Sequence, residues 1–245
     1  MAVIDGATDK SGIRYEWAGE TVSSGRFAAQ VVAGAVRELE PCVSAREAVT
    51  FVTARLDAAV LARQPAIGRH DRPACALVMY SRPHHEVWSV GDCSWAFNGV
   101  EHRGGKKIDD LTASLRADVT EAHLADGWRP EVLADLDPGR QAIQSLLAFQ
   151  GLFANRIHEL GYAAVNGTPV PDVHVGVTPL AGSGVLVLTS DGYPEILDSR
   201  ESSDRRLLDL VRQDPLCIGP LRGPKAVAPG ATTYDDRTWV SLRVG

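Results

Sequence analysis

The stretch VLVLTSDGYPEIL, residues Val185 to Leu197, changes character at Ser190. The first five residues are apolar or β-branched without polar alternation, which predicts a strand that is buried on both faces. Asp191 and Gly192 follow at the mouth of this strand. A carboxylate in that place is partly desolvated and needs a backbone N–H, a basic side chain or a metal ion as its partner. The simpler alternative is a Ser-Asp-Gly turn in which Asp191 caps the next helix.

The composition excludes several classes of protein. The chain has 245 residues, of which 44% are hydrophobic and 23% charged, as in an ordinary globular protein. It has no apolar run that could span a membrane and no signal-peptide pattern at its start. The net charge of −6 gives no electrostatic reason to expect nucleic acid binding. The four cysteines have no C-x-x-C spacing, so we expect reduced thiols in a cytoplasmic protein.

Strands and helices are segregated along the chain. Hydrophobic periodicity predicts strands over 1–5, 74–81, 86–92, 94–100, 174–180, 184–191 and 235–244, and helices over 23–39, 44–61 and 203–213. Residues 6–21 read as a loop, and 74–100 as a three-stranded antiparallel meander. Residues 108–162 read as mainly helical, with one apolar stripe formed by Ile143, Leu146, Leu147, Phe153, Ile157 and Leu160. This order predicts an α+β fold with layered sheets in a single domain, residues 1–245.

Acidic residues stand at the ends of three predicted strands. Asp5 ends the first strand and precedes Gly6, Asp191 ends a later one, and Asp235 and Asp236 begin the last. If these ends meet, their charges repel unless cations bridge them, and Mg²⁺ and Mn²⁺ prefer such oxygen ligands. A glycine after the aspartate allows a backbone carbonyl to approach the ion as well. The alternative is three unrelated turns.

Four segments in order resemble the metal-dependent serine/threonine phosphatases, type 2C. VIDGATDKSG with the following SSGRFAAQVVAGAV resembles that family's Asp-Gly loop and helix, and VWSVGDCSWAFNG resembles its Gly-Asp-Ser hairpin. VLVLTSDGYPEIL resembles its Ser-Asp-Gly segment, and YDDRTWVSLRV its closing Asp-Asn strand. The resemblance implies a four-layer αββα sandwich, in which two antiparallel β-sheets are flanked by helices.

The resemblance also implies a site and an activity. Asp5 would bridge two ions of Mn²⁺ or Mg²⁺, Gly6 would offer its carbonyl, and Asp191 and Asp235 would each bind one ion. Asp236 matches the Asn of the family's closing Asp-Asn pair. Asp92 matches the Asp of the Gly-Asp-Ser hairpin, which has a structural role in the family. The reaction would be hydrolysis of a phosphomonoester by a metal-activated water. The substrate would be a phosphoserine or phosphothreonine protein, or a small phosphorylated metabolite.

The sequence departs from the family around Asp5. The family has a preceding strand with an acidic pair and a phosphate-binding Arg, and no such strand stands before Asp5 here. Its Asp-Gly-His-Gly-Gly motif has Ala7 at the His and Thr8 at the next position. Lys10 and Arg14 are candidate phosphate ligands, or only solvated loop charges.

Two further interpretations therefore remain beside the phosphatase. In one, the chain is a catalytically weak or inactive member of the family that acts as a binding or regulatory module. In the other, it is an ordinary α+β domain whose acids only cap turns.

Overall fold

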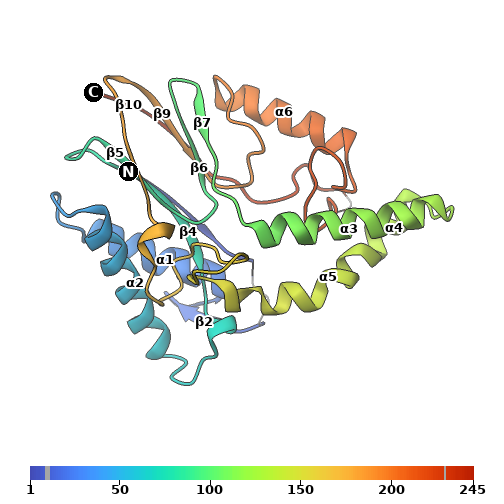
Figure 1. The fold of residues 1–245 in the computed structure, drawn as a ribbon, viewed down its shortest axis with the longest axis horizontal. Coiled ribbons are helices and arrows are strands. Elements are labelled where there is room, and N and C mark those ends of the chain that lie inside the picture. Colours follow the sequence, from blue (N-terminus) through green and yellow to red (C-terminus); the bar gives the residue numbers. More distant parts are fainter. Residues whose placement is uncertain (9–11, 229) are drawn as a thin grey trace.

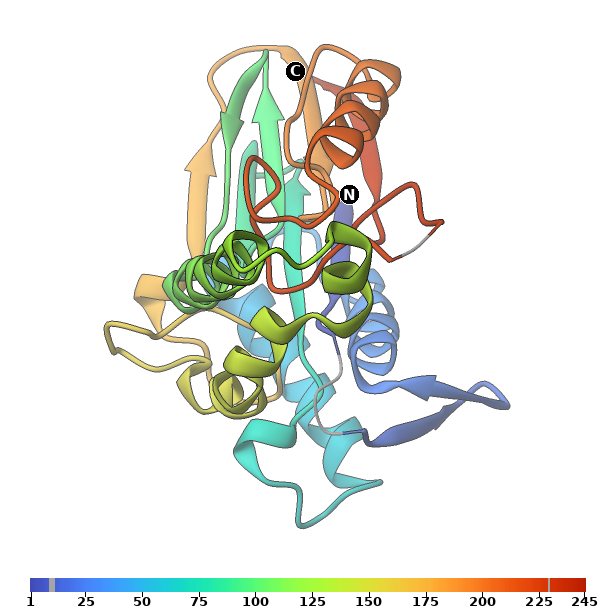
Figure 2. The same ribbon diagram turned by 90° about the vertical axis from the view of Figure 1, so that its right-hand side faces the viewer.

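The protein is an α+β fold with two main antiparallel sheets (Figures 1 and 2). The computed structural model describes residues 1–8, 12–228 and 230–245. One sheet has the order β1-β4-β5-β8 and contains β1 (Ala2–Gly6), β4 (Cys75–Ser81), β5 (Glu86–Val90) and β8 (Gly176–Pro179). The other has the order β10-β9-β6-β7 and contains β6 (Ser94–Phe97), β7 (Val100–His102), β9 (Gly184–Thr189) and β10 (Trp239–Val244).

The helices lie around these sheets. They are α1 (Ser24–Arg37), α2 (Ala45–Leu61), α3 (Lys107–Ala125), α4 (Pro130–Leu136), α5 (Pro138–Phe149) and α6 (Arg200–Gln213). Both of the first two helices begin at a serine cap, and Ser44 forms the predicted capping box with Glu47. Within the described residues, no helix has the length and apolar character that a membrane span requires. All four cysteines are free, and three of them are buried.

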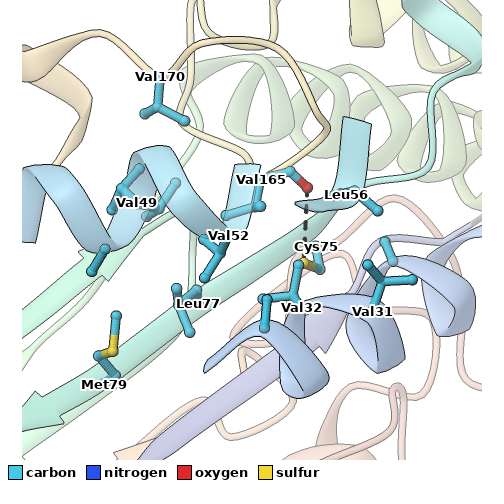
Figure 3. Packing of buried hydrophobic residues seen from close by; sticks show 14 of the residues in the cluster. Val31, Val32, Val49, Val52, Leu56, Cys75, Leu77, Met79, Val165 and Val170 are labelled. Carbon is cyan, nitrogen blue, oxygen red and sulfur yellow. Dashed lines mark hydrogen bonds between the residues drawn. The ribbon is translucent and has the colours of Figure 1, made fainter. Parts of the chain in front are cut away.

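The first sheet has an apolar core on each of its faces. Leu77, Met79 and Trp88 pack under the valines of α1 and α2, and Figure 3 shows Val32 and Val52 pointing at β4 from the two helices. The alternate residues of the same strands point the other way. They pack against β9 and β10, and this second cluster includes Val3, Val78, Val87, Leu186, Leu188 and Val244. The two sheets therefore share one buried interface.

Two local predictions were wrong because burial depends on partners elsewhere in the chain. The segment read as a loop contains a hairpin, β2 (Arg14–Trp17) with β3 (Glu20–Ser23). Tyr15 stacks on Phe27 of α1 with ring centroids 4.3 Å apart, so α1 stabilises the hairpin. The three-stranded meander is also wrong. β5 pairs with β4 and β8, whereas β6 pairs with β9 and β7, so the chain changes sheets between Val90 and Ser94.

Two predicted boundaries were also wrong. The apolar stripe does not form one helix, because α5 ends at Phe149 and Ile157 is 83% exposed. Beyond it, Asn155 has a φ of 55° and its side-chain amide bonds to residues 164–168, which competes with helix formation. The last strand begins at Trp239, so Asp235 and Asp236 lie in the loop before it.

The first aspartate is positioned by a glycine-to-glycine contact. Gly6 ends β1 directly against the first turn of α1, where a Cβ on Gly6 would lie 2.5 Å from the carbonyl oxygen of Gly25. A Cβ on Gly25 would collide equally with the backbone after Gly6. The end of β1 and the start of α1 therefore fit together only without side chains, and this fixes Asp5 relative to the helix.

We expect Gly6→Ala to destabilise the protein by about 1–3 kcal/mol, the usual cost of overpacking. Gly34→Ala is the matched control on α1, because a Cβ added at Gly34 would have no neighbouring atom within 4 Å. That substitution should be neutral or should stabilise by up to about 1 kcal/mol, since alanine has the higher helix propensity. Urea unfolding of the two variants measures the difference. Equal stabilities would contradict the packing described here.

Candidate metal and phosphate site

A cavity of about 420 Å³ opens where β1 and β9 end. Its lining comes from the ends of these strands, the segment before α3 and the loop after α6. Ten of the described residues in this lining are charged. The acids are Asp5, Asp92, Asp109, Asp191, Asp235 and Asp236, and the bases are Arg103, Lys106, Arg222 and Lys225.

Asp5 and Asp191 are the centre of the acidic group. They come from different sheets, yet their side chains meet, and this interaction lowers the pKa of Asp5 and raises that of Asp191. Asp5 is half-buried, and Asp191 keeps an exposed surface although the protein atoms around it disfavour its charged form. Burial raises the pKa of Asp5 to about 6 and that of Asp191 to about 8, and the charges of neighbouring acids add to both.

The glycine after Asp191 has a steric explanation. A Cβ on Gly192 would lie 2.0 Å from the carbonyl oxygen of Asp236, so only glycine lets the loop before β10 approach this turn. Ser190 holds the same loop, because its Oγ accepts a hydrogen bond from the Thr238 N–H at 2.9 Å. The Tyr234 hydroxyl donates to the Asp191 carbonyl at 2.9 Å. The Ser-Asp-Gly turn is thus fitted to the segment that carries Asp235.

Asp235 is engaged by a base. Lys225 Nζ lies 3.3 Å from Asp235 Oδ1, and the Asp236 N–H donates to the same oxygen at 3.1 Å. Asp236 itself is more exposed, and burial together with the Asp235 charge raises its pKa. The cation beside Asp235 is a lysine from another loop, which the sequence pattern did not indicate.

A second pair flanks the acids. Lys106 Nζ lies 2.5 Å from Asp92 Oδ2 and 3.8 Å from Asp109 Oδ2, and its side chain is only 15% exposed. Although burial favours its neutral form, the charges of Asp92 and Asp109 raise the pKa of Lys106 well above its usual range. Gly104 makes this approach possible, because a Cβ there would lie 2.6 Å from the Asp92 Cα. The predicted structural role of Asp92 stays a prediction, and this ion pair supports it.

The loop Asp214–Lys225, hereafter the basic loop, forms one wall of the cavity. The Asp214 carboxylate accepts backbone hydrogen bonds from Ile218, Gly219 and Leu221, at 2.8–3.0 Å. Arg116, which is completely buried, donates to three carbonyls of this loop and pairs with Asp137 at 3.0 Å. Sequence reasoning missed both anchors, because an arginine in a helix reads as a solvated residue.

The structure brings together four of the six predicted site residues. Asp5, Gly6, Asp191 and Asp235 line the same cavity. Arg14 is exposed on β2 and is not part of that lining. Lys10 lies outside the described residues.

The donor set suits a hard divalent cation in its chemistry. Carboxylate oxygens are the ligands that Mg²⁺ and Mn²⁺ prefer, and a cation beside Asp5 and Asp191 would relieve the repulsion that helps to raise their pKa values. In the part of the chain that the structure describes, no three His, Cys, Asp or Glu side chains converge in a metal-binding arrangement. The third candidate, Asp235, is held by Lys225 instead. Asp5, Asp191 and Asp235 are the residues that would hold such an ion.

No family model and no curated protein matches this sequence. Solved structures resemble it along its whole length, and serine/threonine phosphatases are among them. The catalytic domain of the phosphatase PstP with two manganese ions has 13% identity and a TM-score of 0.44, over 100% of this chain and 96% of its own. PstP/Ppp of Mycobacterium tuberculosis has 15% identity and a TM-score of 0.42, and the match covers 100% of this chain and 97% of that one.

A Stage II Sporulation E family protein from Thermanaerovibrio acidaminovorans has 16% identity and a TM-score of 0.42, over 98% of this chain and 92% of its own. These neighbours are the kind of protein that the sequence motifs resemble. Likenesses with TM-scores this low carry no argument about chemistry, which has to come from the residues of the cavity.

The raised pKa values of Asp5 and Asp191 make the stability of the metal-free protein depend on pH. The folded state keeps protons on Asp5 and Asp191 up to pH values of about 6 and about 8, whereas an ordinary aspartate with a pKa of 3.8 has released them. Stability from this pair is therefore complete below pH 3.8 and is lost as the pH rises toward 8. We expect Asp191→Asn to flatten this dependence and to melt above the wild type at pH 8.

Calorimetric melting between pH 5 and pH 9 in the presence of a chelator measures this effect. Asp118→Asn is the control, since Asp118 is an exposed residue of α3 outside the cavity. Its melting temperatures should run parallel to those of the wild type. An Asp191→Asn curve that also runs parallel would show that the pKa of Asp191 is not raised.

Proposed function

We propose that this chain is a metal-dependent phosphatase that hydrolyses a phosphomonoester, with Mn²⁺ or Mg²⁺, two ions, as its cofactor. The observation that carries the proposal is the contact between Asp5 and Asp191 inside a charged cavity. Two acids from separate sheets are held together although this raises their pKa values. A neutral residue at either position would avoid that cost. A site that collects carboxylates in this way is suited to cations.

Different residues of this chain would bind the metal ions, orient the ligands and supply positive charge. Asp5 and Asp191 would hold the first ion, Gly6 would offer a carbonyl, and Asp235 would complete the set after leaving Lys225. When bound, such ions polarise a phosphate and activate water for in-line attack. The chain itself orients the ligands through Gly192 and Ser190, and supplies positive charge from Lys225 and Arg222 at the rim.

The substrate is proposed as a class only. A phosphoserine or phosphothreonine protein and a small phosphorylated metabolite both present the dianion that this cavity would take. We also infer a single phosphatase-like domain over residues 1–245 with the four-layer αββα order. Support comes from α1 and α2, which cover one face of the first sheet, and from Tyr193, whose ring packs edge-on to Trp239 of β10 and whose hydroxyl bonds to Asp204 of α6.

One observation favours a second candidate, a binding or regulatory module without turnover. Lys225 already neutralises Asp235, and the described acids do not converge on a common point. A protein of this kind would bind a phosphorylated ligand and leave it intact.

The test is hydrolysis of p-nitrophenyl phosphate and of a phosphoserine peptide with saturating Mn²⁺ or Mg²⁺. We expect turnover that requires the metal and stops with a chelator. Asp191→Asn should lower turnover at least about 100-fold, because it removes a charged ligand. Asp92→Asn should instead lower stability by about 3 kcal/mol, because it leaves the buried Lys106 without its full partner.

The outcomes separate the candidates. Mn²⁺ binding without hydrolysis of either substrate would favour the binding module. If calorimetry detects no Mn²⁺ binding, both candidates fail and the acids only cap turns. Equal loss of turnover in the two variants, with no loss of stability in Asp92→Asn, would contradict the roles assigned to these residues.

A further inference from the structure

Four bases line the cavity among the described residues, and two of them are committed to carboxylates. Lys106 is largely buried and pairs with Asp92 at 2.5 Å. Arg103 pairs with Glu101 at 2.7 Å, and the same carboxylate oxygen of Glu101 also accepts the Ile196 N–H. Releasing Lys106 would leave a largely buried Asp92 without its partner. The Arg103 pair is shorter than the contact of Lys225 with Asp235, 2.7 Å against 3.3 Å, so Arg103 is held more firmly than Lys225.

Arg222 and Lys225 are the two bases that are more available to a ligand. Arg222 is exposed, and none of the described carboxylates forms an ion pair with it. Its Nε donates to the Ile218 carbonyl at 3.2 Å, which orients the guanidinium and leaves its terminal nitrogens without a hydrogen bond to any described residue. Lys225 makes a single long contact with Asp235, 3.3 Å, with its side chain 37% exposed. Both cations can therefore turn to a ligand at little cost.

The basic loop presents these two residues on a rigid base. The Pro224 carbonyl accepts a hydrogen bond from Arg140 at 2.6 Å, and the Ala226 N–H donates to Asp137 at 3.4 Å, so Lys225 is anchored on both sides. Arg116 bonds to the Gly223 carbonyl at 3.2 Å, between the two bases. This buried arginine donates to three carbonyls of the basic loop and so fixes the loop's position.

The net negative charge of the cavity opposes anion binding by Arg222 and Lys225. Six acids and four bases line it among the described residues, so the metal-free cavity repels a phosphate dianion. A divalent cation on Asp5, Asp191 and Asp235 reverses this balance. It also frees Lys225, because Asp235 then has a stronger partner.

We propose that Arg222 and Lys225 of the basic loop bind the phosphate group of the substrate, with Lys225 exchanging Asp235 for the phosphate when a cation is bound. The proposal rests on the proposed function, since it assigns part of the same site. Arg222 offers the planar, bidentate donor that suits phosphate, and Lys225 offers a point charge.

The test is binding of inorganic phosphate to the Mn²⁺-loaded protein, measured by titration calorimetry. We expect Arg222→Gln and Lys225→Gln each to weaken phosphate binding about tenfold or more, as loss of a charge-assisted hydrogen bond does. Lys225→Arg should retain most of the affinity. Arg205→Gln is the matched control, because Arg205 is an exposed arginine of α6 outside the cavity. It should bind phosphate like the wild type.

A second readout separates phosphate binding from support of the metal. Lys225→Gln should bind Mn²⁺ at least as tightly as the wild type, because the substitution removes a competitor from Asp235. Weaker Mn²⁺ binding in this variant, or unchanged phosphate binding in both variants, would overturn the proposal. So would a wild type that binds no phosphate with or without Mn²⁺. Phosphate binding that depends on both residues without any hydrolysis would defeat only the proposed function.

Discussion

The contact between the carboxyl groups of Asp5 and Asp191 joins the ends of two strands that belong to different sheets. This contact exists only because the two sheets pack face to face through Val3, Leu186 and their neighbours. The acids could have been kept apart by a small change in either strand end. Two backbone contacts prevent that: Gly6 on Gly25 and Gly192 on Asp236. Each requires glycine for space, so the acidic centre is a consequence of close backbone packing.

Groups of the chain itself partly offset the negative charge around this centre. The pKa values of Asp5 and Asp191 are raised, Lys225 lies beside Asp235, and Lys106 lies beside Asp92. An incoming cation can take the place of the protons and of Lys225, since it competes for the same carboxylate oxygens and the lysine contact is long. The Lys106 pair is short and largely buried, which fits a structural part. The part of the cavity with Asp5, Asp191 and Asp235 can therefore exchange its partners, whereas the Lys106–Asp92 pair is fixed. The basic side chains of the basic loop lie beside the part that can exchange.

Much of the fold could be predicted from local signals. The unbroken apolar run before Asp191 predicts β9, and the capping box at Ser44 predicts the start of α2. The sheet change after Val90 could not be predicted, because strands of both sheets show similar patterns. The β2–β3 hairpin was missed for a related reason, since the burial of Tyr15 depends on Phe27 in a later helix.

The site too could be predicted only in part. The acids could be found because a carboxylate at a buried strand end is a conspicuous signal in sequence. The bases could not, because Lys106, Arg222 and Lys225 gain their meaning only from loops that fold back over the strand ends. Arg14 was considered because it is near Asp5 in sequence, but β2 places it on the surface outside the cavity. Closeness along the chain was a poor guide here to closeness in space.

The central claim is that Asp5, Asp191 and Asp235 form one cation site. An anomalous difference map at the manganese edge, from crystals grown with Mn²⁺, tests it most directly. The account predicts a peak with oxygen atoms of all three aspartates about 2–2.6 Å away, and Lys225 moved off Asp235. A map without a peak in this cavity, or with a peak bound by other residues, would contradict it.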